Sequence, residues 1–426
     1  MRANPVWLLG AAPLLLWPAV LNGYPLVFAD TGTYVSQAVN HYLGWDRPPF
    51  YSLFLLPLHM KITTWPAIAV QALLACWVIS IVGRVLVRGW PDWMIVPVAA
   101  AMACLTPLPW TVSELSPDFL TPLMVLGLAL LLLVPDRLAR WEQFGLIATT
   151  ALGVAAHLSN LPIAAILLCI LLPVRPSLAP LAGPALGVVA LVSVNLIAGR
   201  GFAIAPYGNV FFLARVIADG PGRDIMRADC PLSAWRLCPY TDELPDTADD
   251  FLWAQNSPLY AAGGPKQVST EADAIIVAAM SAEPFREAAA FAANGGEQFW
   301  RFATGDGLRP WPREVTPWIV RDFPRAEVAR YMAARQTRGL PLVPGWMQRL
   351  HLAVSISSIL MCLVLLVAPN CRGSPRSGLL VAALLGIVGN AIVCGGLSGP
   401  HDRYQSRVMW LPELVAGLAV ASRIRG

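Results

Sequence analysis

Long apolar runs, separated by short polar segments, recur along this chain. Ten of them approach the roughly 20 mostly apolar residues that a membrane-spanning helix needs. The first run is too long for a cleaved secretory signal and no small-residue cleavage site follows it, so we expect it to be a span. The pattern predicts an all-α polytopic membrane protein with about ten transmembrane helices, near residues 6–26, 66–83, 93–108, 118–135, 144–157, 160–174, 179–198, 350–368, 378–397 and 408–422.

The basic residues of the short connections predict the orientation of these spans. With the N-terminus inside, the short outer segments contain four basic residues, Arg47, Lys61, Arg403 and Arg407. The inner segments contain ten, namely Arg2, Arg84, Arg88, Arg137, Arg140, Arg175, Arg372, Arg376, Arg423 and Arg425. By the positive-inside rule both termini are expected to be cytoplasmic. Only two of the 30 lysine and arginine residues are lysines, which is typical of a GC-rich bacterial genome and suggests a bacterial inner membrane.

This topology divides the chain into three parts. The segment 199–349 falls outside, and a connection of that length must contain structure of its own. Helical patterns at 271–294 and 324–337 predict a mostly helical periplasmic domain there, inserted before the last three spans. The polar junction 157–162 predicts a tight hairpin between two short spans. The expected parts are a seven-helix module at 1–198 with a first outer loop at 27–65, the domain at 199–349, and a three-helix module at 350–426.

The composition agrees with a membrane protein and excludes a nucleic-acid-binding protein. Charged residues make up 13% of the chain, against about 25% in soluble proteins, and the mean hydropathy is +0.58. A net charge of +4 over 426 residues is far from a basic nucleic-acid-binding domain, so no nucleic-acid partner is expected. The eight cysteines form no C-x-x-C motif and no cluster of metal ligands is apparent, so we expect no required metal.

Cys230 and Cys238 lie eight residues apart in the predicted periplasmic domain. The outside of a bacterial inner membrane is oxidising, so a disulfide between them is favoured. The alternative is a pair of buried thiols.

Charged and polar side chains collect at the predicted outer ends of the spans. Ionisable groups at the edge of a membrane are costly and need a reason. The predicted inner ends contain mainly scattered arginines, which the orientation already explains. The outer face is therefore the expected chemical face, with Asp30, Asp46, Arg47, Glu114, Asp118, His157, Asp402, Arg403 and Arg407.

Each of these residues also has a purely structural interpretation. Asp30 directly precedes a stretch with helical spacing, 31–43, and could act only as its cap. Asp46 and Arg47 could form a surface ion pair, and Glu114 with Asp118 could favour a helix N-terminus. His157 could bond a carbonyl group in the hairpin. The two arginines near the last span could pair with Asp402 or with lipid head groups.

The first outer loop resembles that of a known enzyme family. Asp30, Tyr34 and the sequence Arg47-Pro48-Pro49-Phe50-Tyr51 follow an N-in first span. This arrangement resembles the GT-C glycosyltransferases, polytopic enzymes that use polyprenyl-phosphate sugars, and is most similar to the lipid A and protein O-mannosyl transferase branch. Residues 113–118 and Arg403-Tyr404 are similar to two further polar stretches of that fold. The resemblance covers residues 1–200 and, loosely, the last 25.

Two departures from the family pattern concern the site. Position 31 is Thr, so the second acid that commonly follows the aspartate is absent. A histidine or lysine near the donor phosphate cannot be placed in this sequence.

The resemblance implies transfer of a sugar from a polyprenyl-phosphate donor to a cell-envelope glycan, lipid or protein. Such a reaction needs a carboxylate as general base and a cation for the departing phosphate. The expected base is Asp30, and the expected phosphate ligands are Arg403, Arg407 and Arg47. No further cofactor is implied, and the expected partners are membrane lipids, the donor and the acceptor. The expected substrate-binding residues are Tyr34, Asp46, Glu114, Asp118, His157 and Tyr404.

Other functions remain as alternatives. A lipid or glycan transporter or flippase should show inverted repeats and ionisable residues near the membrane midplane, neither of which is apparent. An acyltransferase or phosphotransferase would need a nucleophile or a His–Asp pair that the sequence does not single out. A non-catalytic subunit of an envelope-glycan assembly system would not need Asp30, which is present.

Overall fold

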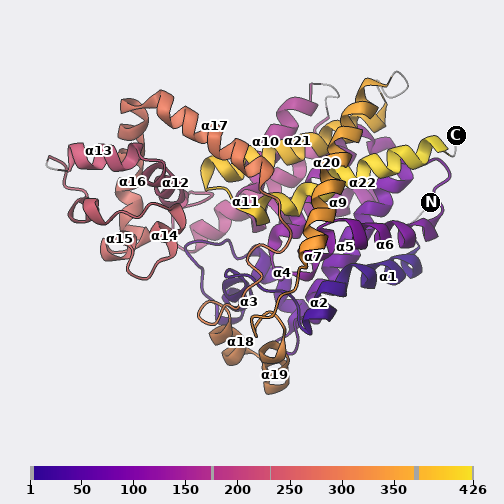
Figure 1. The fold of residues 1–426 in the computed structure, drawn as a ribbon, viewed down its shortest axis with the longest axis horizontal. Coiled ribbons are helices and arrows are strands. Elements are labelled where there is room, and N and C mark those ends of the chain that lie inside the picture. Colours follow the sequence, from indigo (N-terminus) through magenta and orange to yellow (C-terminus); the bar gives the residue numbers. More distant parts are fainter. Residues whose placement is uncertain (1–3, 174–176, 231, 369–373, 425–426) are drawn as a thin grey trace. The chain divides into compact units, whose positions relative to one another are not determined.

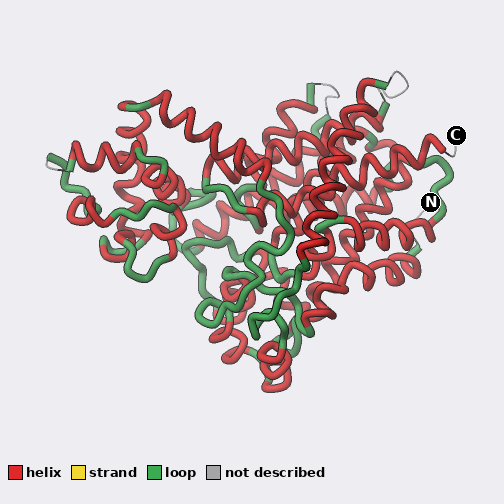
Figure 2. The backbone as a smooth tube through the Cα atoms, viewed as in Figure 1, coloured by secondary structure: helices red, strands yellow, loops and turns green. Residues whose placement is uncertain are grey.

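The computed structural model describes residues 4–173, 177–230, 232–368 and 374–424, and within these ranges it consists of helices and loops (Figures 1 and 2). The only strand-like pairing there is an isolated parallel bridge between Leu26 and Glu114. The protein is therefore all-α, as the sequence predicts. Of the arginines used for the orientation, four lie outside the described residues: Arg2, Arg175, Arg372 and Arg425.

Within the described ranges, five helical segments are long and apolar enough to cross a membrane. The first, Pro5–Asn22, consists of α1 (Pro5–Ala11), a 3-10 turn and α2 (Trp17–Asn22). The others are α5 (Trp65–Leu86), the segment Ala179–Ile197 that contains α11 (Ala182–Ile197), α20 (Gly345–Val367) and α21 (Pro375–Leu397). These coincide with five of the predicted spans, and their length and composition are those of a membrane-embedded protein.

The other five predicted spans are also helices, but they are shorter or more charged. They are α6 (Ile95–Leu105), α8 (Leu120–Leu133), α9 (Arg140–Ala156), α10 (Asn160–Leu171) and α22 (Asp402–Ile424). Every residue of α8 is buried, so protein surrounds this apolar helix on all sides. The number of ten spans therefore stays a prediction.

Two local predictions can be compared directly with the helix ends. Between α9 and α10 lie only residues 157–159, which form the predicted tight hairpin. The helix expected over 31–43 is shorter: α3 covers Thr31–Asn40 and ends because His41 adopts a left-handed conformation with φ of 52°. After Pro48 and Pro49 the chain continues into α4 (Phe50–His59).

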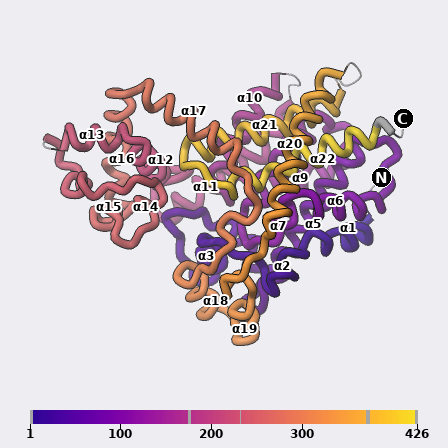
Figure 3. Tube along the Cα trace, in the orientation of Figure 1, coloured from indigo at the N-terminus to yellow at the C-terminus, as the bar shows by residue number. Residues whose placement is uncertain are grey.

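The chain forms two compact units whose boundary differs from the predicted one. Unit 2 comprises Ala190–Arg301 and Asn390–His401, whereas Phe302–Gly389 belongs to unit 1 together with Met1–Val189 and Asp402–Gly426. The predicted domain at 199–349 thus ends at residue 301 as a compact body. Residues 302–344 lead through α18 (Thr316–Asp322) and α19 (Arg325–Ala333) to α20 within unit 1 (Figure 3).

Buried hydrogen bonds explain why this segment belongs to unit 1. The side chain of Gln336 accepts from the backbone of Val27 at 3.1 Å and donates to its carbonyl at 2.6 Å. The backbone of Gln336 donates to Asn22 Oδ1 at 2.7 Å. Glu327 accepts from both the backbone and the hydroxyl of Thr64, at 2.8 and 3.0 Å. These polar groups would lack partners if the segment were elsewhere.

Unit 2 is built mainly from α12 (Gly208–Ala218), α13 (Pro221–Asp229), α16 (Pro265–Ala282) and α17 (Pro284–Trp300), with short helices α14 (Ala248–Trp253) and α15 (Pro258–Ala261). The single helix expected over 271–294 is two helices because Pro284, which has no N–H, begins α17. Cys230 and Cys238 form a disulfide with their Cα atoms 5.2 Å apart. Buried Arg215 pairs with Asp219 at 2.6 Å and Glu287 at 2.7 Å inside this unit.

Candidate functional site

Five charged residues from four segments of unit 1 meet in one place, which we call the charged cluster. Asp30 directly precedes α3, and Arg47 lies between α3 and α4. Asp118 lies in the 3-10 turn Pro117–Phe119 that leads into α8, and Arg403 and Arg407 lie on the first two turns of α22. The side chains of all five are at most 18% exposed. Buried charges of this kind are stable only when they are paired.

Asp30 forms ion pairs and does not cap α3. Its Oδ2 lies 2.9 Å from Nη2 of Arg47 and 3.7 Å from Nη2 of Arg403, and its side chain makes no capping hydrogen bond with α3. Among the described residues both ion pairs of Asp30 end on Oδ2. Arg47 also donates to the carbonyl of Asp46 at 3.0 Å. Arg47 therefore orients the carboxylate of Asp30.

Asp118 bridges the two arginines of α22. Its Oδ1 accepts from Nη1 of Arg407 at 2.6 Å, and its Oδ2 lies 3.3 Å from Nη1 of Arg403. The four-residue spacing of the arginines places both on one face of the helix. The cluster contains three guanidinium groups and two carboxylates, so it carries a net positive charge by itself.

The hairpin between α9 and α10 fixes the guanidinium of Arg407. Nη2 of Arg407 donates to Ser159 Oγ at 3.1 Å, and Nη1 lies 3.2 Å from His157 Nε2. A guanidinium can only donate, so Nε2 of His157 accepts in this contact. Nδ1 of His157 in turn lies 2.8 Å from Ser159 Oγ. Among the described residues the ring of His157 thus contacts Arg407, Ser159 and, at 3.4 Å, Oδ1 of Asp118, and it bonds no carbonyl group of the hairpin.

Arg403 is held by stacking as well as by charge. Its guanidinium lies 3.7 Å from the centroid of the Phe28 ring and 5.3 Å from that of Tyr404. Its backbone N–H donates to Asp306 Oδ2 at 3.1 Å. Gly307 makes room for the ring of Phe28, since a Cβ there would lie 2.2 Å from it. The turn at 305–307 therefore positions both the ring and the arginine.

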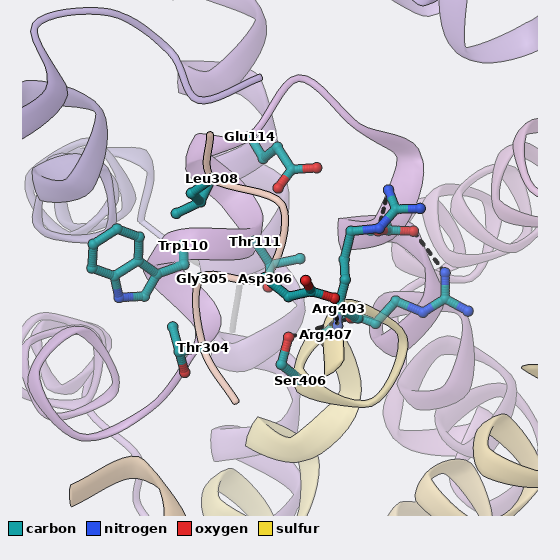
Figure 4. Close-up of a pocket in the computed structure, with 11 residues that line it drawn as sticks. Trp110, Thr111, Glu114, Thr304, Gly305, Asp306, Leu308, Arg403, Ser406 and Arg407 are labelled. Atoms are coloured by element: carbon teal, nitrogen blue, oxygen red, sulfur yellow. Dashed lines mark hydrogen bonds and ion pairs between the residues drawn. The ribbon is translucent and has the colours of Figure 1, made fainter. Parts of the chain in front are cut away.

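A small cleft, which we call the cavity, adjoins the charged cluster (Figure 4); the space between its lining atoms, open solvent included, is about 380 Å³. Four predicted site residues line it: Glu114, Asp118, Arg403 and Arg407. Asp30 does not line it, but its carboxylate pairs with Arg403, which does. The remaining lining residues are Trp110, Thr111, Thr304, Gly305, Asp306, Leu308 and Ser406.

Glu114 is the buried acid of the cavity that has no cation directly paired with it among the described residues. It is 8% exposed, and burial raises its pKa to about 8. The positive charge of Arg403 opposes this shift, whereas the nearby carboxylate of Asp118 adds to it. Glu114 is therefore largely protonated at neutral pH.

The other predicted site residues surround the cluster without lining the cavity. Tyr34 is buried edge-on against the ring of Tyr51, 5.1 Å away, and burial raises the pKa of its hydroxyl well above the usual range. Burial also raises the pKa of the Asp46 carboxyl. The ring of Tyr404 lies beside both arginines of α22. None of these three residues lines the cavity.

Sequence reasoning missed several residues of the cavity. Asp306 is exposed and lies in a turn between Gly305 and Gly307, whose φ angles are 95° and 74°. An acid flanked by two glycines is a signal for a tight polar turn, but it does not indicate where the turn lies. Ser406 lies between the two arginines of α22, and the sequence pattern there singles out the charged residues and not the serine. Trp110, Thr111 and Thr304 have no distinguishing signal.

The described part of the chain contains no group of three or more His, Cys, Asp and Glu side chains arranged to hold a metal ion. No known protein family, curated protein or solved structure matches this chain. An assignment of function therefore rests on the geometry of the cluster and the cavity.

Proposed function

We propose that this chain is an integral-membrane glycosyltransferase of the GT-C type. It would transfer a sugar from a polyprenyl-phosphate-linked donor to a cell-envelope acceptor on the periplasmic side of a bacterial inner membrane. The observation that supports this proposal most is the charged cluster. Beside one cavity, Arg403 and Arg407 meet the carboxylates of Asp30 and Asp118, which lie far from them in the sequence.

The two arginines of the cavity differ in how firmly protein partners hold them. Arg407 has a short contact with Asp118, at 2.6 Å, and its side chain is 1% exposed. Arg403 makes longer ion pairs, 3.3 and 3.7 Å, than the about 2.8 Å of a strong charge-assisted hydrogen bond. Arg403 is thus the better ligand for an incoming phosphate, and Arg407 the structural anchor beside it.

The proposed reaction is a single displacement. The hydroxyl oxygen of the acceptor forms a bond to the anomeric carbon of the sugar, and the bond from that carbon to the phosphate oxygen breaks. The electron pair of that bond leaves with the lipid phosphate, whose added charge Arg403 and Arg407 neutralise. The proton of the hydroxyl passes to Oδ1 of Asp30, while Arg47 holds Oδ2. One carboxylate suffices for this single displacement because the phosphate leaves without a general acid, whereas glycosidases, both retaining and inverting, use a pair of carboxylates.

The topology is part of the proposal. Ten spans with both termini in the cytoplasm would place the cluster at the periplasmic ends of the helices. The polyprenyl chain would then lie between helices in the bilayer while its phosphate reaches the arginines at the interface.

The decisive test is transfer of a radiolabelled sugar from polyprenyl phosphate by the purified protein. Asp30→Asn keeps the size of the side chain but removes the base, so activity should fall by at least about 10²-fold. The matched control is Asp273→Asn, at an exposed position of α16 in unit 2, which should behave as wild type. An Asp30→Asn protein with wild-type activity would remove Asp30 as the base. A folded wild-type protein that transfers no sugar from any polyprenyl phosphate would refute the proposed function.

A further inference from the structure

The backbone around Glu114 is fixed on every side. It forms the parallel bridge with Leu26, and the flanking residue Leu115 donates to the carbonyl of Leu26 at 2.9 Å. The side chain of Gln71, which is fully buried on α5, donates to the carbonyl of Glu114 at 2.9 Å. The backbone of Glu114 is therefore held in place between α7 (Leu108–Ser113) and the turn that contains Asp118.

One oxygen of the Glu114 carboxyl group lacks a protein partner among the residues that the structure describes. Oε1 of Glu114 is buried and has no hydrogen-bond partner among the described residues, although the residue lines the cavity. In Figure 4 the carboxyl group points toward the side of the cavity where Arg403 lies. A buried polar group without a partner is costly, so the arrangement points to a group supplied by a ligand.

The surrounding charges disfavour an ionised Glu114. The charged groups that act on it are Arg403 of α22, Asp118 of the 3-10 turn before α8, Asp30 before α3, and Asp306 of the 305–307 turn. Three of these four are acids, and the one cation already pairs with Asp118 and Asp30. Together with burial, this keeps the carboxyl group neutral at neutral pH, so that it can donate a hydrogen bond.

We propose that Glu114, as a neutral carboxylic acid, donates a hydrogen bond to an oxygen of the donor phosphate that Arg403 binds. The assignment rests on the proposed function for the identity of the donor, but the chemistry requires only a phosphate group. A neutral acid shares Arg403 with an anion without repulsion, whereas a carboxylate would compete for the arginine and repel the phosphate. Hydrogen bonds from O–H to a charged oxygen are short and strong.

The direction of the pH effect follows from this role. Below about pH 8 Glu114 is protonated and donates to the phosphate. As the pH rises through that value the proton is lost, and the hydrogen bond becomes a repulsion between two anions. Phosphate affinity should therefore fall on the alkaline side. The phosphodiester of the donor has no second proton to lose, and the phosphate monoester used as the probe, with a second pKa of about 6, is already fully ionised there.

The test is equilibrium binding of radiolabelled undecaprenyl phosphate to the full chain in nanodiscs of zwitterionic lipid, near pH 7 and near pH 9.5. The wild type should lose about 10- to 30-fold in affinity between these pH values, because a group with a pKa of about 8 keeps its proton in only a few per cent of the molecules at pH 9.5. Glu114→Gln keeps an N–H donor that does not titrate, so its affinity should stay nearly constant. Glu114→Leu should bind weakly at both pH values, and its thermal unfolding shows whether it folds.

The comparison of wild type with Glu114→Gln decides the proposal even if Glu114→Leu does not fold. Equal pH dependence of these two proteins would overturn the role of Glu114. A second experiment adds inorganic phosphate as a competitor. Displacement of the lipid, with the same difference in pH dependence between the two proteins, confirms a phosphate site. Lipid binding that inorganic phosphate does not reduce assigns the site to the lipid-linked form. Because binding is measured without transfer, a protein that binds in this way but transfers no sugar refutes the proposed function and leaves the role of Glu114 intact.

Discussion

Arg407 and Arg403 lie one helical turn apart, yet the structure gives them different tasks. Arg407 contacts Asp118, His157 and Ser159 within 3.2 Å. Arg403 stacks on Phe28, and its ion pairs within the described residues are longer, 3.7 and 3.3 Å. An arginine surrounded by short contacts stabilises the fold, whereas one with longer contacts has more to gain from a ligand.

This difference predicts that alanine at the two positions affects different properties of the protein. The main effect is on stability at Arg407 and on donor binding at Arg403. Arg407→Ala leaves Asp118 with the weaker of its two arginine partners, so it should cost about 3–5 kcal/mol of stability, the range for breaking a buried ion pair. Arg403→Ala should cost less stability but raise KM for the donor by about 10- to 100-fold through the lost phosphate contact. Thermal unfolding in detergent and steady-state kinetics with the polyprenyl-phosphate sugar check both effects. Equal loss of stability in the two proteins would contradict the division of tasks.

At the scale of elements, the site depends on turns as much as on helices. The hairpin at 157–159 places two acceptors on Arg407, and the turn at 305–307 places Phe28 beneath Arg403. Gly307 is the critical position of that turn because φ is +74° and a Cβ would lie 2.2 Å from the Phe28 ring.

We therefore predict that Gly307→Ala damages the site beyond its local backbone strain. Alanine in a left-handed conformation costs about 1–2 kcal/mol, and displacement of Phe28 should in addition raise KM for the donor several-fold. Gly339→Ala is the matched control, since φ there is +71° but a Cβ would meet only Pro310, at an ordinary 3.7 Å. It should lower the unfolding temperature and leave KM unchanged. If both variants show the same KM, the turn does not position Arg403.

At the scale of the whole molecule, the proposed topology can be tested independently of the proposed sugar transfer. A cysteine at Lys266, in α16 of unit 2, should react with an impermeant thiol reagent in intact spheroplasts. A cysteine at Arg376, in the first turn of α21, should react only after the membrane is permeabilised. The background is a protein in which the exposed Cys104 and Cys169, and also Cys371, which lies outside the described residues, are replaced by serine. The reverse labelling pattern would put the charged cluster on the cytoplasmic side and remove a periplasmic reaction.

The division of the chain into units shows where long segments are hard to assign from sequence. Residues 302–344 are polar and rich in proline and glycine, like the stretch that precedes them, and so they read as part of one outer domain. Their place in unit 1 depends on Gln336 and Glu327, which bond backbone groups near Val27 and Thr64. A buried glutamine has no sequence pattern that names its partner.

The amino-acid sequence by itself determined where the long apolar helices of this protein lie, because long apolar runs and their polar ends are local properties of the chain. It also indicated which charges need partners, since an acid or arginine at the end of an apolar run is costly when unpaired. Only the tertiary structure decided which charges meet. Asp118 and Arg407 are separated by 289 positions, and nothing local distinguishes their pairing from one between Arg407 and Asp402. The same holds for the cavity, which includes Asp306 and not Asp30, because its walls come from packing between distant segments.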